Sequence, residues 1–386
     1  MEFPKHLSEK LEARKQQDAL RSVSSKIVGI DFSSNDYLGL ASSSKNYLSA
    51  HERIVVSNTL QSGAGGSRLL SGNHALYSKA EAIIAKFHVC EAALIYTSGY
   101  TANLGLLGAI TDKECVVLYD GLCHASIREA IGFSKTKAYK FSHNDLDHLK
   151  KLINKFKPSA KSVFVITESV FSMDGDSPDL VELATMCKAH NCYLIIDEAH
   201  AVGVFGSKGQ GLVQHFQLQD LVFARIVTFG KALGGHGAAV LGSKQLTDYL
   251  TNFSRTFIYT TALAPITIAG VIEAYEWLQQ SNESNQELQK LHCNIAILRS
   301  CIIKHGLDGQ FIDSKSAIHC CVISGNGRVK EISKKLLAIH MDVRPILAPT
   351  VAKGQERLRI CLHSFNTEEQ IEKLIGAIAK FTAVKG

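Results

Sequence analysis

The chain has 386 residues, of which 46% are hydrophobic and 20% charged, a composition typical of a globular protein with one large and one smaller domain. Its 42 basic and 36 acidic residues leave a formal net charge of +6, and the basic residues are spread along the chain. This spread argues against nucleic-acid binding. No apolar run reaches the ~18 residues that a membrane span requires, so we expect no membrane association.

The N-terminal segment and the cysteines indicate a compartment. The first 22 residues are charged throughout and lack the apolar core and cleavage site of a secretory signal, so we expect a cytoplasmic protein. The ten cysteines lie at irregular spacings without a CxxC pair, and several fall inside apolar runs. This pattern favours small buried side chains in a reducing compartment over disulfides or metal ligands.

Short β-branched runs alternate with helix-length segments from about residue 90 onward. The runs cover residues 92–95, 115–119, 162–167, 193–196, 225–229 and 238–241. Between them, residues 179–190 place Leu180, Leu183 and Cys187 at helical spacing. Strands that are apolar along their whole length are buried on both faces, so the sequence predicts an α/β fold with a mostly parallel sheet covered by helices.

The pattern changes near Pro265. A long helical stretch is predicted over residues 267–305, followed by strands at 318–323 and 357–362. The last helix is predicted to begin at Asn366 as its N-cap, supported by Glu369. We therefore expect an N-terminal arm at residues 1–45, a large domain at 46–265 and a small α+β domain at 266–386.

One lysine, Lys231, lies among glycines in TFGKALGGHGAAVLG (228–242), directly after a predicted strand. A phosphate loop of the NTPase type would need Ser or Thr after the lysine and a glycine five residues before Gly230, but these positions hold Ala232 and Arg225. The segment IIDEAH (195–200) resembles the acidic box of a helicase, yet no phosphate loop accompanies it. The glycine-rich GAGGSR and GVFGSKGQG also lack dinucleotide-binding spacing.

A lysine held at the mouth of a rigid sheet can instead form a Schiff base with an aldehyde cofactor such as pyridoxal phosphate. This chemistry needs a carboxylate that keeps the pyridine nitrogen protonated. Asp197 follows the predicted strand at 193–196 and Lys231 the one at 225–229, so both are expected at the carboxyl edge of the sheet. His200 could then donate a hydrogen bond to the phenolic oxygen of the cofactor.

A phosphate site is predicted in YTSGYTAN (96–103). There a strand runs into Thr-Ser-Gly and then a helix, so that hydroxyls and backbone amides meet at a helix N-terminus. Thr228 offers another hydroxyl. In YDGLCHAS (119–126), His124 follows the strand at 115–118, and we expect it to stack on the pyridine and to do acid–base work. Each feature alone is commonly structural, but their joint order favours one cofactor site.

Five segments resemble the α-oxoamine synthases, a family of fold-type-I pyridoxal-phosphate enzymes. They are SSNDYLGLA (33–41), DGLCHASIREAI (120–131), TESVFSMDGDSPDL (167–180), IIDEAHAVGVFG (195–206) and TFGKALGGHGA (228–238). The resemblance runs from about Leu11 to the last helix. It implies an aspartate-aminotransferase-like fold and a homodimer with its active site at the subunit interface, where residues 63–74 and 259–265 are expected to cross.

The resemblance also implies a role for each matching position. Lys231 would form the Schiff base, Asp197 would pair with the pyridine nitrogen, His200 would contact the phenolic oxygen and His124 would stack on the ring. The residues implied around the phosphate and beside the cofactor are Ser98, Gly99, Tyr100, Thr228 and Ser172. The implied substrate contacts, besides His124, are Arg359 for the amino-acid carboxylate, Asn35, Thr350, and Arg21 for the acyl substrate.

The implied reaction is a decarboxylating condensation of an amino acid with an acyl-CoA or an acyl-carrier-protein thioester. The segments LEARKQQDALR (11–21) and FSMDGDSPDL (171–180) are most similar to the family members of biotin synthesis, which favours L-alanine and a pimeloyl thioester. Glycine with acetyl-CoA, or serine with a long-chain acyl-CoA, is the alternative, because the acyl pocket lies in divergent parts of the chain.

Overall fold

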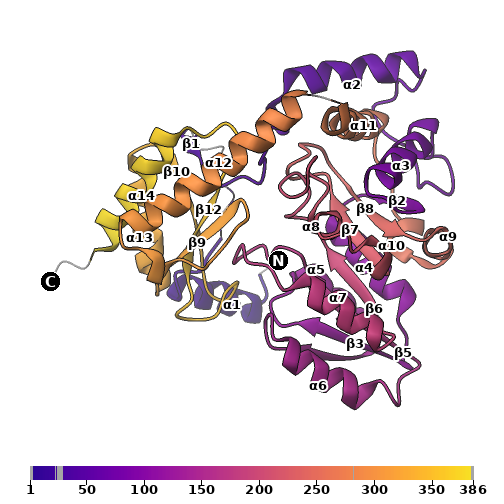
Figure 1. Cartoon of the computed structure of the whole chain (residues 1–386), viewed down its shortest axis with the longest axis horizontal. Coiled ribbons are helices and arrows are strands. Elements are labelled where there is room, and N and C mark those ends of the chain that lie inside the picture. The colour runs from indigo at the N-terminus through magenta and orange to yellow at the C-terminus, as the bar shows by residue number, and fades with distance from the viewer. Residues whose placement is uncertain (1–2, 22, 24–28, 281, 384–386) are drawn as a thin grey trace. The chain divides into compact units, whose positions relative to one another are not determined.

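The structure is a computed structural model that describes residues 3–21, 23, 29–280 and 282–383 (Figure 1). It divides into two compact units. The larger unit comprises residues 35–172 and 177–289, and the smaller unit comprises residues 1–34, 173–176 and 290–386. This division differs from the arm, large domain and small domain expected from the sequence, since residues 266–289 fall in the larger unit. The reason is that helix α11 (Pro265–Gln280) packs against α2 (Ser44–Val56) and α3 (Ala75–Phe87).

A seven-stranded sheet forms the centre of the larger unit, in the order β2-β8-β7-β6-β5-β3-β4. Its strands are β2 (Ala92–Tyr96), β3 (Cys115–Asp120), β4 (Lys137–Phe141), β5 (Ser162–Glu168), β6 (Tyr193–Asp197), β7 (Ala224–Thr228) and β8 (Ala238–Gly242). The strands from β7 to β4 pair in parallel, and only β8 is antiparallel to its neighbours β2 and β7 among the described strands of this sheet. The mostly parallel sheet predicted from the sequence is confirmed.

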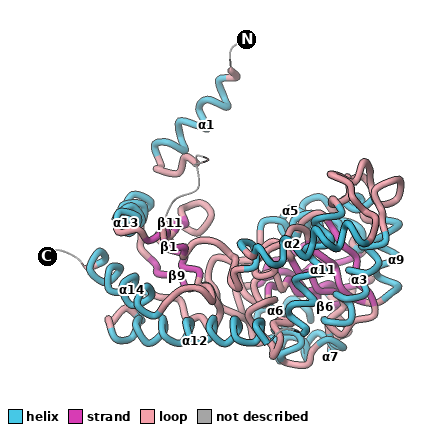
Figure 2. Tube along the Cα trace, turned by 90° about the horizontal axis from the view of Figure 1, so that it is seen from above, coloured by secondary structure: helices cyan, strands magenta, loops and turns pink. Residues whose placement is uncertain are grey.

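Successive residues of the central strands enter two separate hydrophobic cores, one on each face of the sheet. Val117 and Ile166 belong to one core, whereas their neighbours Val116 and Val165 belong to the other. The first core includes residues of α4 (Gly99–Ile110), α5 (Ala125–Phe133), α9 (Lys244–Phe253) and α10 (Arg255–Ile258). The second includes residues of α6 (Leu146–Phe156), α7 (Leu180–Ala189) and α8 (Leu212–His215). Burial on both faces explains why the strands lack polar alternation, and Figure 2 shows the strands enclosed by helices.

Two ion pairs connect helices α2 and α11 in the larger unit. The Arg53 guanidinium donates to Glu273 at 2.5 Å and to Glu276 at 2.6 Å. The long helical stretch predicted for residues 267–305 is two helices, α11 and α12 (Asn282–Lys304), and the division between the units falls within α12. Short 3-10 turns cover Leu40–Ser42, Gln219–Leu221 and Asp308–Gln310.

The smaller unit contains a three-stranded antiparallel sheet in the order β11-β12-β9. Its strands are β9 (Ile318–Val322), β11 (Arg344–Ile346) and β12 (Arg357–Cys361), and a separate parallel pair joins β1 (Ile30–Asp31) to β10 (Met341–Asp342). The helices of this unit are α1 (Lys5–Gln16), most of α12, α13 (Asn326–Ala338) and α14 (Glu368–Thr382). Ile371, Leu374, Ile375 and Ile378 lie at helical spacing and are buried on α14, whereas Phe381 on the same face is half-buried.

The predicted N-cap of this last helix is wrong by one residue. Thr367 caps α14, in a reciprocal capping box with Gln370 in place of the expected Asn366 and Glu369. The Asn366 side chain instead accepts from the His363 N–H at 2.9 Å and donates to the Asp31 carbonyl at 3.1 Å. Both residue types cap helices well, so only the tertiary contacts of Asn366 decide between them.

Eight of the ten cysteines are buried, and Cys293 is exposed. The described residues include no cluster of three or more His, Cys, Asp or Glu side chains that could hold a metal ion. None of the described helices combines the length and apolar character that a membrane crossing would demand.

Candidate active site

Three neighbouring parallel strands deliver polar side chains to one edge of the sheet. Glu168 ends β5 directly opposite Asp197, which ends β6, and Thr228 ends β7. Lys231 follows three residues after Thr228, in the loop between β7 and its antiparallel neighbour β8. Carboxyl ends of parallel strands form the common ligand site of such sheets.

The loop that carries Lys231 is closed at its base. The Phe229 N–H donates to the Gly237 carbonyl at 2.9 Å, and the Gly235 N–H returns to the Phe229 carbonyl at 2.8 Å. Gly237 has a φ of 105°, in the region that side chains other than glycine rarely adopt, and a Cβ there would lie 3.0 Å from the Tyr96 carbonyl oxygen. The glycines therefore allow a tight return to β8 while Lys231 stays at the edge of the sheet.

The side chain of Lys231 meets a short chain of hydrogen bonds. Its Nζ lies 2.6 Å from His200 Nε2, and His200 Nδ1 lies 2.7 Å from the hydroxyl of Tyr37. That hydroxyl donates to Asn35 Oδ1 at 3.2 Å. Tyr37 and His200 are buried, and Lys231 is half-buried. The structure thus brings together the predicted residues Lys231, His200 and Asn35. It adds Tyr37, which was not predicted although it lies in SSNDYLGLA.

A second chain of hydrogen bonds connects Asp197 to His124. The side-chain amide of Asn103 donates to Asp197 Oδ2 at 2.9 Å and to Ser126 Oγ at 3.0 Å. Ser126 Oγ lies 2.8 Å from His124 Nδ1, and the Ser126 N–H donates to the same nitrogen at 3.2 Å. The other carboxylate oxygen of Asp197 accepts from the Ala199 N–H at 3.0 Å. Asn103 and Ser126 were not predicted, because a buried amide on a helix has no signature in the sequence.

The ring of His124 is held in its neutral form. Burial lowers its pKa, the Asp197 carboxylate opposes this shift, and Lys231 and Arg128 lower the pKa further. Because the Ser126 N–H donates to Nδ1, this nitrogen carries no proton in the neutral ring, so the proton lies on Nε2. His124 therefore presents Nε2–H as a hydrogen-bond donor.

Glu168 is a buried carboxyl group that sequence reasoning missed. Its side chain accepts from the His124 N–H at 2.6 Å. Burial and the nearby Asp197 carboxylate raise the pKa of Glu168 to about 8, against the opposing effects of Lys231 and of the backbone amides of His124 and Ser172. The buried Ser172, one of the predicted cofactor residues, is thus linked to His124 through this one carboxyl group. A strand-end Glu in an apolar run gave no signal of this role.

The predicted phosphate segment forms a helix N-terminus beside the end of β7. Ser98 caps α4: its Oγ accepts from the Thr101 N–H at 3.1 Å, and its own N–H donates to Thr101 Oγ1 at 3.0 Å. A Cβ placed on Gly99 would lie 3.9 Å from Thr228 Oγ1, so the helix start and Thr228 are neighbours. Tyr100, in the first turn, is 40% exposed. Amides at a helix N-terminus with nearby hydroxyls suit a phosphate group.

The remaining predicted substrate residues belong to the smaller unit. Arg21 donates to Thr350 Oγ1 at 3.1 Å, so these two residues meet although they are far apart in the sequence. Arg359 is 8% exposed on β12, where its Nη1 lies 2.9 Å from Cys361 Sγ.

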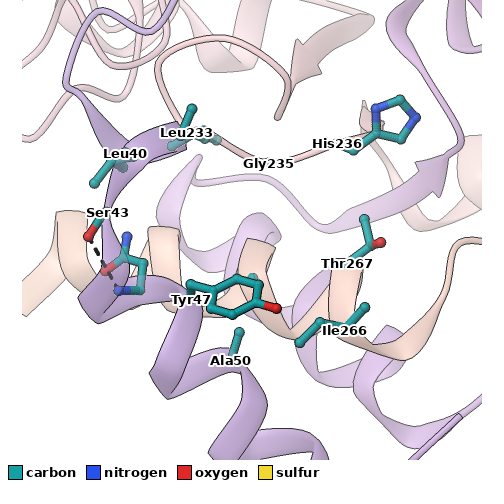
Figure 3. A pocket seen from close by; sticks show the side chains of 13 residues that line it. Leu40, Ser43, Tyr47, Ala50, Leu233, Gly235, His236, Ile266 and Thr267 are labelled. Carbon is teal, nitrogen blue, oxygen red and sulfur yellow. Dashed lines mark hydrogen bonds between the residues drawn. The ribbon is translucent and has the colours of Figure 1, made fainter. Parts of the chain in front are cut away.

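The loop after Lys231 also lines a cavity of about 240 Å³ (Figure 3). Its walls come from the 3-10 turn Leu40–Ser42, α2, the loop and α11, and the Asn46 N–H donates to Ser43 Oγ among the lining residues. The lining residues are Leu40, Ala41, Ser43, Asn46, Tyr47, Ala50, Leu233, Gly234, Gly235, His236, Ile266, Thr267 and Gly270. This set includes none of the predicted site residues, so the cavity is distinct from the lysine site.

Pyridoxal phosphate fits the arrangement at the sheet edge. Its aldehyde requires an amine, which the half-buried Lys231 supplies close to a strand end. Its pyridine nitrogen requires a carboxylate, which Asp197 supplies on the next strand, held by two donors. Its phosphate requires a site such as the capped N-terminus of α4.

Comparison with known proteins agrees with this fit. The family described as aminotransferase class I and II matches residues 27–378. The chain is 37% identical over 366 residues to the 8-amino-7-oxononanoate synthase of Emericella nidulans, covering 91% of this chain and 88% of that protein. The solved 8-amino-7-oxononanoate synthase of Francisella tularensis is 28% identical, with a TM-score of 0.77 over 91% of this chain and 97% of that one.

A serine palmitoyltransferase from S. paucimobilis with a bound PLP–myriocin aldimine has the same fold, with a TM-score of 0.87 at 22% identity, covering 98% of this chain and 96% of that one. The chain therefore belongs to the class I and II aminotransferase family and, within it, to the α-oxoamine synthases, the pyridoxal-phosphate acyltransferases that its motifs resemble. The expected fold-type-I architecture is confirmed.

Proposed function

We propose that this chain condenses L-alanine with a pimeloyl thioester, carried by CoA or an acyl-carrier protein, to give 8-amino-7-oxononanoate for biotin synthesis. The observation that carries the proposal is the Lys231 amine 2.6 Å from His200, with Asp197 on the adjacent strand. The names of the relatives at 37% and 28% identity support this choice of substrates.

Bound pyridoxal phosphate supplies a cationic ring that stabilises negative charge at the α-carbon of the amino acid. Asp197 holds the proton on the pyridine nitrogen, and Asn103 keeps the carboxylate in place. Ser98, Gly99, Tyr100 and Thr228 hold the phosphate at the start of α4, while Ser172 lies beside the ring. The dipole of the helix adds to the attraction.

Lys231, with His200 beside it, serves proton transfer at the α-carbon, and His124 acts on the thioester carbonyl. With cofactor and amino acid bound, the Lys231 amine would accept the α-proton at Nζ, and His200 beside it would receive or return a proton. His124 would lie against the ring, and its Nε2–H would donate to the thioester carbonyl oxygen as the new carbon–carbon bond forms and the thiol leaves. Loss of carbon dioxide and return of a proton to the α-carbon complete the reaction.

The substrate contacts complete the proposal. The Arg359 guanidinium binds the amino-acid carboxylate in a bidentate manner, and Asn35 contributes a further polar contact. Arg21 and Thr350, which are hydrogen-bonded to each other, contact the acyl substrate. The working form is a homodimer, in which residues 63–74 and 259–265 of each subunit approach the active site of the other.

A sister reaction is the second candidate, namely serine with a long-chain acyl-CoA or glycine with acetyl-CoA. The chain shares the fold of serine palmitoyltransferase, with a TM-score of 0.87, so the scaffold is compatible with this reaction. Because that likeness is at 22% identity, it supports a common fold and not a common substrate.

Thiol release from acyl-CoA tests both candidates. Purified chain with pyridoxal phosphate is incubated with alanine, glycine or serine against pimeloyl-, acetyl- and palmitoyl-CoA. We expect the highest kcat/KM for alanine with pimeloyl-CoA, and borohydride should remove the visible band of the wild type while Lys231→Ala shows no such band. A wild type that gains no visible band with pyridoxal phosphate contradicts the proposal, and a preference for serine with palmitoyl-CoA selects the second candidate.

A further inference from the structure

Tyr37 is a buried tyrosine that no role assigned so far explains. Its side chain is 0% exposed, and its hydroxyl lies between His200 Nδ1 at 2.7 Å and Asn35 Oδ1 at 3.2 Å. A hydroxyl has one hydrogen, so it can donate to only one of these two atoms at a time. The position of this hydrogen has consequences for His200 and, through it, for Lys231.

The hydrogen bonds determine which nitrogen of His200 is protonated. An amide oxygen is an acceptor only, so the Tyr37 hydroxyl donates to Asn35 Oδ1 and accepts from His200 Nδ1–H. A neutral ring with its proton on Nδ1 leaves a lone pair on Nε2, which faces Lys231 Nζ at 2.6 Å. In this first arrangement Nε2 accepts a hydrogen bond from the Lys231 ammonium group.

A second arrangement follows if the hydroxyl hydrogen turns from Asn35 to His200 Nδ1. The ring proton then lies on Nε2, where it donates to a neutral Lys231 amine or, with the cofactor bound, to the phenolic oxygen. The two arrangements differ by one proton, which is bound to Lys231 in the first and has left to solvent in the second. The neutral amine of the second arrangement is the form that reacts with an aldehyde.

We propose that Tyr37 is a positioning residue whose hydroxyl, shared between Asn35 and His200, sets which nitrogen of His200 carries the proton. This inference rests on the proposed function only where it gives the His200 ring proton a role toward Lys231 and the cofactor. The tautomer of His200 itself can be measured without the cofactor.

Nitrogen NMR of the full chain with ring-labelled histidine measures the tautomer directly, and a His200→Asn variant assigns the signal. In the cofactor-free wild type we expect the proton on Nδ1. In Asn35→Ala the hydroxyl loses the Asn35 oxygen as an acceptor and is expected to turn to Nδ1, which places the ring proton on Nε2. Asn35 is only half-buried, so this variant is expected to fold even if Tyr37→Phe does not. A wild type with the proton on Nε2, or a tautomer unchanged in Asn35→Ala, would overturn the inference.

The holoenzyme gives a second readout, the pH titration of the visible cofactor band. With the cofactor bound, Tyr37 keeps the proton on Nε2, whose hydrogen bond stabilises the phenolate. Tyr37→Phe should therefore move the midpoint upward by about half to one pH unit, the equivalent of one hydrogen bond. The matched control is Tyr275→Phe, which removes an equally buried hydroxyl 3.0 Å from His88 Nε2 and should leave the midpoint unchanged.

Equal midpoints for Tyr37→Phe and the wild type, or an equal shift in Tyr275→Phe, would contradict the inference. A wild type that gains no visible band with pyridoxal phosphate counts against the proposed function instead. In that event, the NMR comparison still decides the role of Tyr37.

Discussion

Glu168 and Asp197 lie directly opposite each other at the ends of two neighbouring parallel strands, and both are buried. Two carboxyl groups in this position are not both easily ionised, because each raises the cost of charging the other. The pKa of Glu168, about 8, reflects its burial first and this proximity second. Glu168 therefore remains largely protonated near neutral pH beside the Asp197 side chain.

The first prediction concerns stability and pH. The folded-state pKa of Glu168 lies above its ordinary value of 4.5, so its contribution to stability is fully present below pH 4.5 and is lost as the pH rises toward 8. In Glu168→Gln this loss should disappear, and the slopes of unfolding free energy against pH should differ by up to about 1.4 kcal/mol per pH unit in that window. Urea unfolding of the cofactor-free chain from pH 4.5 to 8.5 measures the difference, and parallel curves would contradict the prediction.

The second prediction concerns the carboxylate on β6. Asp197→Asn keeps the size of the side chain but removes the charge that would hold the pyridine proton. We expect kcat to fall by at least about 100-fold, within the range for losing a charge-stabilising or proton-holding group. Asn103→Ala, which removes the donor to Asp197 Oδ2, should give a smaller loss. Activity of Asp197→Asn within a few fold of the wild type would exclude the assigned role.

The third prediction separates helix capping from phosphate binding. Ser98→Ala removes the cap of α4 and should cost about 1 kcal/mol of stability, with a weaker affinity for pyridoxal phosphate in addition. Ser243→Ala removes the equivalent cap of α9, where Ser243 Oγ accepts from the Leu246 N–H at 3.1 Å. It should cost similar stability and leave the affinity unchanged. Fluorescence titration with the cofactor and thermal unfolding compare the two variants, and equal affinities would disprove the phosphate role of Ser98.

The fourth prediction concerns a buried ion pair behind the site. Arg225 on β7 lies 3.5 Å from Glu198, which directly follows β6, and its guanidinium also donates to Gln214 and to the His88 carbonyl. Arg225→Ala would remove the cation beside the buried Glu198, whose pKa burial already raises, and would leave Gln214 and the His88 carbonyl without their donor, so we expect a loss of about 3–5 kcal/mol in denaturant unfolding. The exposed pair Lys161–Glu114 is the control, since Lys161→Ala should change stability little. Similar effects of the two substitutions would refute the expectation.

The strands and the principal residues of the site could be predicted from the sequence because they depend on local pattern. Apolar runs mark β6 and β7, so Asp197 and Lys231, which end or follow these strands, could be placed at the same sheet edge. Glu168 at the end of β5 lies at this edge too, but nothing in the sequence indicated its role. Tyr37 and Asn103 escaped prediction, since each acts on a partner that is distant in the sequence. Tyr37 is 163 positions from His200, and Asn103 is 94 positions from Asp197. Contacts of this kind depend on how distant segments of the chain pack together, and the periodicity of apolar residues in the sequence does not reveal this packing.

The N-cap of α14 was also predicted incorrectly because tertiary contacts decide its position. Asn366 and Thr367 are both good capping residues, and the sequence offers no reason to prefer the second. The preference comes from the His363 amide and the Asp31 carbonyl, which engage the Asn366 side chain. Local chemistry therefore located the helix end to within one residue, and tertiary hydrogen bonding determined the rest.

The closed base of the β7–β8 loop has a mechanical consequence. If Lys231 forms the Schiff base as proposed, its amine would bond to the cofactor, leave it and return in every turnover, which requires a mobile side chain on a fixed backbone. The Phe229–Gly237 and Gly235–Phe229 hydrogen bonds fasten this backbone to two paired strands, so the flexible side chain of Lys231 can move while the base of the loop stays in place. We expect a residue inserted between these strands to lengthen the loop and displace the Lys231 amine. The same insertion in an exposed loop elsewhere should leave the position of the amine unchanged.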